Sequence, residues 1–344
     1  MPIRAEAFDD PHGTVLYWLG MAGFLINARG TLLAVDPLLQ DFDMPVLIDF
    51  PLQAADVPRL DAVLVTHADN DHFSVPTCTA LNAVTQRFHS TRYVAELMRE
   101  LGMPADGHGI GDAFSVGGVR VTVTRPTTPG RMPRPAGQRT FHDEDSCGFW
   151  IETLDGVIWA PGDSRLIREH HLTMPTPDAL LFDFSDSEWH FTFDGAVEMA
   201  NAHPDADLLL HHWGSVDSPE FAPFNADPDT LRDAVVNPSA SVCSHRASLS
   251  GWGRVRGGAT HSAVDIAKVS GTAAKTRANS TMGCAGGFHR TPSVDKADIS
   301  VDSVHTRFDR TNSPTQFPGW PEKPSENRSP TKSVSSCRTC TPIP

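Results

Sequence analysis

A cluster of acidic and imidazole side chains directly after an apolar segment constrains this chain most. The apolar segment covers residues 62–65, and four consecutive apolar residues, two of them β-branched, predict a buried strand. The next residues read Thr66-His-Ala-Asp-Asn-Asp-His72, and Ser74 and Pro76 then predict the first turn of a helix. The cluster therefore lies on a strand-to-helix loop, where α/β proteins place their chemistry.

The cluster holds two histidines and two aspartates within six residues: His67, Asp69, Asp71 and His72. Carboxylates held this close repel one another unless a positive charge lies between them, and a divalent cation supplies that charge. Histidine and aspartate are also ordinary ligands of zinc, iron and manganese. The spacing predicts a metal site, and the alternative interpretation is a solvated polar loop.

Around this cluster, apolar and turn patterns predict further elements. The expected strands are residues 15–19, 23–27, 31–35, 179–182 and 207–210, with hairpins at 114–123 and 147–160. The expected helices run from the cluster to residue 84, from 91 to 101, and from 195 to 202 with Asp194 as N-cap.

The cluster resembles the His-x-His-x-Asp-His motif of the metallo-β-lactamase superfamily. His67, Asp71 and His72 match the motif, whereas Asp69 replaces its second histidine. The resemblance covers roughly residues 14–215. It implies an α/β fold, the four-layer αββα sandwich of that superfamily, without a large inserted domain.

The resemblance also implies ligands outside the cluster. In that superfamily a strand ending in Gly-Asp supplies an aspartate that bridges two metals, and Asp163 matches it. In the lactonase-like branch, which includes ascorbate-phosphate lactonases, His212 matches a later ligand, and its neighbour His211 then turns away. His142 is the candidate for the third histidine, or belongs to an acidic surface turn. Asp36 is expected to be a structural acceptor beneath the metal loop.

These residues predict a metal-dependent hydrolase with one or two divalent ions, zinc, or manganese or iron because Asp69 adds oxygen to the site. A water molecule activated by the metal would attack an ester, lactone or phosphodiester of a small substrate, with Asp71 orienting or deprotonating it. The rival hypotheses are an iron-dependent oxidoreductase on the same scaffold and an inactive protein that keeps the fold.

Charge and composition restrict the partners of the chain. The net charge of −14 over 344 residues argues against nucleic acid as the main partner. No secretory signal stands at the start, and the longest apolar stretch, residues 15–26, is too short for a bilayer. Six cysteines without framework spacing favour a cytoplasmic protein. The loop at residues 125–139 carries arginines and is either a contact for an anionic substrate or a connector.

Composition changes near Pro238. Every lysine lies after that point, and the only leucine there is Leu249. We therefore expect a folded hydrolase domain over residues 1–238 and a disordered tail over 239–344 that contributes no ligand. With GC-rich codons, a shifted frame near codon 238 encodes an alternating strand that a Pro-Gly turn closes. The tail is thus predicted to be a frameshifted reading, the alternative being an ordinary disordered extension.

Overall fold

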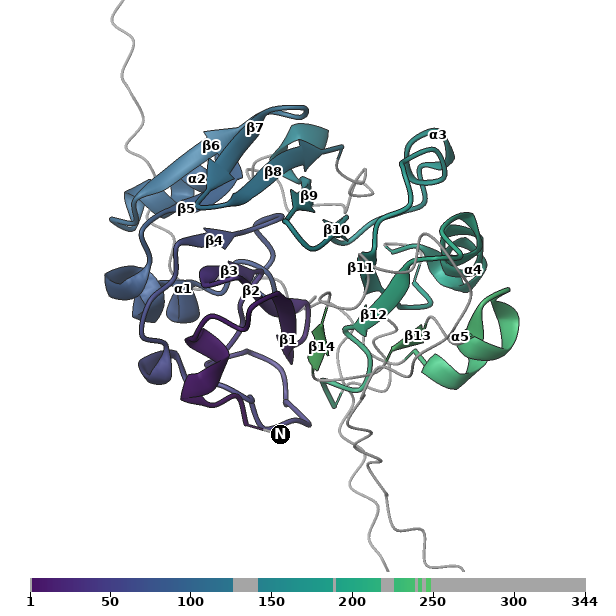
Figure 1. The fold of residues 1–344 in the computed structure, drawn as a ribbon, viewed down its shortest axis with the longest axis horizontal. Coiled ribbons are helices and arrows are strands. Elements are labelled where there is room, and N and C mark those ends of the chain that lie inside the picture. The colour runs from purple at the N-terminus through teal and green to yellow at the C-terminus, as the bar shows by residue number, and fades with distance from the viewer. Residues whose placement is uncertain are drawn as a thin grey trace, which may run out of the picture. The chain divides into compact units, whose positions relative to one another are not determined.

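The protein forms two mixed β-sheets with helices packed against both (Figure 1). The structure is a computed structural model, and it describes residues 2–125, 142–187, 190–217, 226–238, 241–242 and 246–248. All of them belong to the first of two units, Met1–Ala273. The second unit, Ala274–Pro344, lies outside the described residues, as does most of the arginine-bearing loop.

The first sheet has the strand order β14-β1-β2-β3-β4-β5-β6. Strands β3 to β6 run parallel, and β1 pairs antiparallel with both β2 and β14. The bounds of its strands are β1 Thr14–Gly20, β2 Gly23–Ala28, β3 Thr31–Val35, β4 Ala62–Leu64, β5 Phe88–Thr91, β6 Ala105–His108 and β14 Arg246–Ser248.

The second sheet mirrors this plan, with the order β13-β12-β11-β10-β9-β8-β7. Strands β10 to β13 run parallel, and β7, β8 and β9 are antiparallel neighbours. Its strands are β7 Ala113–Val116, β8 Val119–Thr124, β9 Gly148–Glu152, β10 Val157–Ala160, β11 Ala179–Asp183, β12 Asp207–His211 and β13 Ser241–Val242.

The described helices connect the strands. They are α1 Val75–Leu81, α2 Arg92–Glu100, α3 Arg168–His171, α4 Thr192–Ala202 and α5 Pro228–Ala234, with short 3-10 turns at η1 Ala5–Phe8, η2 Ala54–Asp56, η3 Asn82–Val84 and η4 Asp143–Asp145. Ser74 caps α1 by accepting from the Thr77 N–H, as its sequence predicts. Helix α4 begins at Thr192, so Asp194 lies in its first turn and the predicted N-cap is wrong. Among the described residues, no helix has the length and apolarity to cross a membrane.

Along each strand, side chains alternate between packing against the helices and packing against the other sheet. On β3, Leu32 and Ala34 pack with α1 and α2, while Leu33 and Val35 pack with residues of the second sheet. On β11, Leu180 and Phe182 pack with α4 and α5, and their neighbours on the strand face the first sheet. Because successive side chains point to opposite faces, each sheet is buried on both sides. The predicted four-layer αββα sandwich is confirmed.

The structured part continues past residue 238. Strand β13 adds to the edge of the second sheet beside β12, and β14 adds to the first sheet beside β1. Both lie in the segment that the sequence assigns to the tail. The rest of that segment lies outside the described residues, so the predicted disorder and the frameshift stay predictions.

Candidate metal centre

The loop after β4 turns back on itself to present its acidic and imidazole side chains. The backbone N–H groups of His72 and Phe73 both donate to the Asp69 carbonyl, at 3.0 and 2.7 Å. This turn directs Asp71 and His72 toward the loops that follow the parallel strands of the second sheet. The carboxyl ends of parallel strands are the usual place for ligands in α/β proteins.

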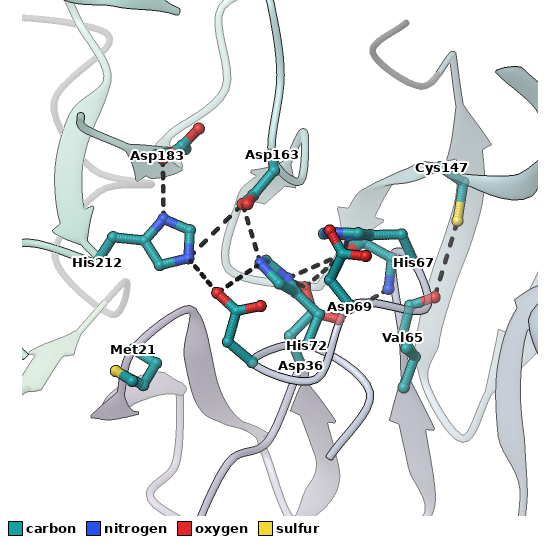
Figure 2. Close-up of polar contacts among 12 residues, drawn as sticks. Met21, Asp36, Val65, His67, Asp69, His72, Cys147, Asp163, Asp183 and His212 are labelled. Carbon is teal, nitrogen blue, oxygen red and sulfur yellow. Dashed lines mark hydrogen bonds and ion pairs between the residues drawn. The ribbon is translucent and has the colours of Figure 1, made fainter. Parts of the chain in front are cut away.

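Four side chains converge there, those of Asp71, His72, Asp163 and His212. Figure 2 shows three of them, His72, Asp163 and His212, pointing toward one another. His72 Nε2 lies 3.0 Å from Asp163 Oδ1 and 3.8 Å from Asp71 Oδ2. His212 Nε2 lies 3.7 and 3.6 Å from the same two oxygens. Ligands about 2.1 Å from one ion lie roughly 3 to 3.5 Å apart, so the donor set fits a divalent metal with little adjustment.

A buried carboxylate holds the far nitrogen of each of these two histidines. His72 Nδ1 lies 2.8 Å from Asp36 Oδ2, and His212 Nδ1 lies 2.9 Å from Asp183 Oδ1. Both acceptors are at most 2% exposed. A carboxylate that accepts the Nδ1–H fixes the tautomer and turns the lone pair of Nε2 toward the centre, as is common around metal-binding histidines.

The pKa shifts of His72 and Asp163 show that the centre favours positive charge between its carboxylates. Although burial opposes it, the carboxylates of Asp163, Asp71 and Asp36 raise the pKa of His72 well above its usual value. Burial also opposes ionisation of Asp163, but the imidazoles of His212, His72 and His190 hold its pKa well below the usual range. A metal ion bound between these side chains would supply the positive charge that the carboxylates favour.

The segment that carries Asp163 approaches the first sheet closely at Gly162. This glycine has φ +73°, and a Cβ there would lie 3.1 Å from the Cys147 carbonyl and from Thr66 Cβ. Asp36 and His212 also have left-handed backbones, with φ of 42° and 69°. Such conformations are uncommon outside glycine and cluster at functional sites, where the surrounding structure holds them.

His67 and Asp69, also predicted as ligands, form a pair beside this group. His67 Nε2 lies 3.4 Å from Asp69 Oδ2, and the His67 and His72 rings are 4.0 Å apart. Asp69 is half-exposed, whereas the ligand atoms of His72 and His212 are buried. The structure brings this pair next to the four converging side chains without making it part of them.

The structure does not bring His142 to the centre. Its side chain is exposed at the start of η4, and its backbone N–H donates to Asp145 Oδ2 at 2.9 Å. Among the described residues, His142 belongs to neither group of converging ligand atoms. The acidic turn after it fixes the residue at the surface, so its place as third histidine, which rests on spacing, finds no support in the geometry.

Two residues that received no role from the sequence lie at the centre. Asp183 ends β11, and its Oδ2 accepts from His190 Nδ1 at 2.6 Å. His190 also lies 3.8 Å from Asp163, and these residues form a second group with His212. Because both Asp183 oxygens already accept from imidazoles, we interpret it as a support for the ligands. The sequence feature that could have indicated Asp183 and His190 is the high density of polar residues at 183–190.

A cleft of about 400 Å³ opens beside His190. Arg165 and Arg168 line it together with the first turn of α4. Glu198 holds the Arg168 guanidinium through both carboxylate oxygens, at 2.7 to 3.1 Å. The cleft therefore places His190 beside the guanidinium groups of Arg165 and Arg168.

Comparisons with known proteins identify the family. The model of the beta-lactamase superfamily domain matches residues 25–213. The chain is 26% identical over 165 residues to a "UPF0173 metal-dependent hydrolase" of Methanoculleus marisnigri, covering 46% of this chain and 61% of that one. It is 29% identical over 191 residues to one of Rubrobacter xylanophilus, covering 54% and 75%.

Among solved structures, the isothiocyanate hydrolase from Delia radicum gut bacteria shares the fold, with a TM-score of 0.50 at 16% identity over 64% of this chain and 90% of that one. The match to the relative from Methanoculleus marisnigri spans less than two thirds of that protein's length. The family model covers more than half of this chain, through all four converging side chains. The chain therefore belongs to the beta-lactamase superfamily and has the metallo-β-lactamase fold.

Proposed function

We propose that the protein is a metal-dependent hydrolase whose metal is held by Asp71, His72, Asp163 and His212. The observation that carries this is the convergence of two carboxylates and two imidazoles, each imidazole oriented by a buried aspartate. The names of the two relatives above support the same activity. We propose that His67 and Asp69, which form a pair beside these side chains, are the candidate ligands of a second ion.

The metal supplies a Lewis acid that polarises a substrate oxygen and makes water acidic enough to react near neutral pH. The chain supplies the rest. Asp71, whose Oδ2 faces both imidazoles, orients the attacking water through its second oxygen. Two nitrogen and two oxygen donors suit zinc, and the extra carboxylate of Asp69 would favour manganese or iron.

The cleft favours a small anionic substrate. Arg165 and Arg168 line it in a chain whose net charge is −14. Glu198 already pairs with Arg168, so Arg165 is the candidate to bind an anionic group. A guanidinium binds a carboxylate or phosphate through two parallel N–H groups. We propose that an anionic group of the substrate binds here while its ester, lactone or phosphodiester bond lies at the metal.

The metal assignment is tested by Asp163→Ala, with Asp217→Asn as control because Asp217 is exposed in the loop after His212. We expect Asp163→Ala to lose metal and hydrolysis together, with metal content below about one tenth of the parent's. Metal analysis of purified protein and p-nitrophenyl ester and phosphodiester assays measure both. Parent-like activity in Asp163→Ala would refute the mechanism.

The anionic preference is tested with two esters of similar length, p-nitrophenyl butyrate and mono-p-nitrophenyl succinate. The parent should favour the charged ester, and Arg165→Gln should lower kcat/KM for that ester about tenfold while sparing the neutral one. Metal content should not change. Equal loss on both esters would show that Arg165 does not recognise the charge.

A further inference from the structure

A buried histidine lies against the segment that carries Asp163. His171 ends the short helix α3 and is fully buried. Its ring contacts Ser164, which separates Asp163, a proposed metal ligand, from Arg165, which lines the cleft.

The hydrogen bonds fix which nitrogen of His171 carries the proton. The Ile167 N–H donates to Nδ1 at 2.9 Å, so Nδ1 is the acceptor and the proton is on Nε2. Burial lowers the pKa of His171 to about 3, which keeps the ring neutral. Nε2–H then donates to Ser164 Oγ at 3.2 Å, and the Ser164 hydroxyl donates to the Arg165 carbonyl at 2.7 Å.

His171 itself is anchored from other elements. The His203 Nε2–H, beyond the end of α4, donates to the His171 carbonyl at 2.8 Å. The ring of Trp159 on β10 lies 5.8 Å from the His171 ring, and the ring of Phe191 lies 5.4 Å away. The imidazole is therefore a rigid donor, held by its backbone and by the packing around it.

We propose that His171 is a positioning residue that, through Ser164, directs Asp163 toward the metal and Arg165 toward the cleft. The proposal rests on the proposed function, because it assigns Asp163 to a metal. One hydrogen bond would serve both ends of the site, since Asp163 and Arg165 are the two chain neighbours of the residue that His171 holds. Loss of the hydrogen bond between His171 and Ser164 should therefore lower the affinity for metal.

Two substitutions separate this role from packing. In His171→Gln the amide nitrogen can reach the place of Nε2 and donate to Ser164. In His171→Asn the shorter amide can replace only Nδ1. Both remove ring packing against Trp159, so both should lower the melting temperature of the metal-free protein. We expect only His171→Asn to weaken zinc binding, about tenfold, in a competition with a chelator. His171→Gln should stay within about threefold of the parent.

Ser164→Ala tests the same bond from its other side and leaves the ring in place. It should weaken zinc binding as His171→Asn does, whereas His203→Gln, which leaves Ser164 untouched, should not. The positioning role is refuted if zinc affinity simply follows melting temperature across the four variants, or if Ser164→Ala binds zinc like the parent. A parent that binds neither zinc, manganese nor iron would instead refute the proposed function, and this role with it.

Discussion

The carboxylate of Asp183 serves two histidines at once. One oxygen accepts from His212, which faces the metal centre, and the other from His190, which lines the cleft. Asp183 is fully buried, so no water replaces either bond. In Asp183→Asn the amide NH2 replaces one of the two accepting oxygens, so one imidazole N–H would face a donor and lose its hydrogen bond. We expect metal affinity about 10- to 100-fold lower, measured by chelator competition. Asp155→Asn, at a distant pair with Arg29, is the control, and equal affinities in the two variants would contradict the expectation.

The sequence could indicate Asp71 and His72 because they belong to a dense polar cluster after an apolar strand. The resemblance to the superfamily's motifs indicated Asp163 and His212. The sequence could not assign Asp183, because its bond to His212 joins residues 29 positions apart and depends on the pairing of β11 with β12. The position of His142 likewise depends on tertiary structure that the sequence does not reveal. Its spacing resembles that of a ligand, but the turn η4 determines where it lies.

At the scale of elements, two aspartates meet where β11 and β12 begin. Burial and then the charge of Asp178 raise the pKa of Asp207 to about 6. Because this value lies above that of the unfolded chain, the folded state binds more protons between pH 4 and 6, and stability falls as pH rises through that range. Asp207→Asn should therefore raise the melting temperature at pH 7, by about 2 °C, and change it little at pH 4. Thermal melts at both pH values measure this, with the exposed Asp205→Asn as control. A melting temperature for Asp207→Asn at pH 7 that equals or falls below the parent's would contradict the prediction.

Before residue 238, the sequence predicted the strands with apolar patterns and missed β5 and β6. These strands read Phe88-His-Ser-Thr91 and Ala105-Asp-Gly-His108, so neither has an apolar run or alternation. Tertiary contacts stabilise them instead. The Ser90 hydroxyl, for example, donates to the Val65 carbonyl at 2.6 Å, beneath the metal loop. Parallel pairing with β4 determines the strand where local propensity does not.

At the scale of the whole molecule, the described strands β13 and β14 make the boundary of the domain testable. A chain that ends at Ser248 keeps both strands and all four proposed ligands, so it should keep zinc stoichiometry and far-ultraviolet circular dichroism. A chain that ends at Pro238 loses the strands and exposes the edges of β1 and β12. We expect it to melt lower and to aggregate more readily. Identical behaviour of the two chains would show that β13 and β14 contribute nothing to stability.

The proposed ligands come from both sheets: Asp71 and His72 follow β4 of the first, whereas Asp163 and His212 follow β10 and β12 of the second. An ion shared by them would act as a cross-link between the sheets. Its binding energy would then add to the free energy of unfolding, by about 1.4 kcal/mol for each tenfold rise in free metal above the dissociation constant. Metal supply would thus control how long the chain persists in a cell, and Asp163→Ala would make the denaturation midpoint independent of zinc.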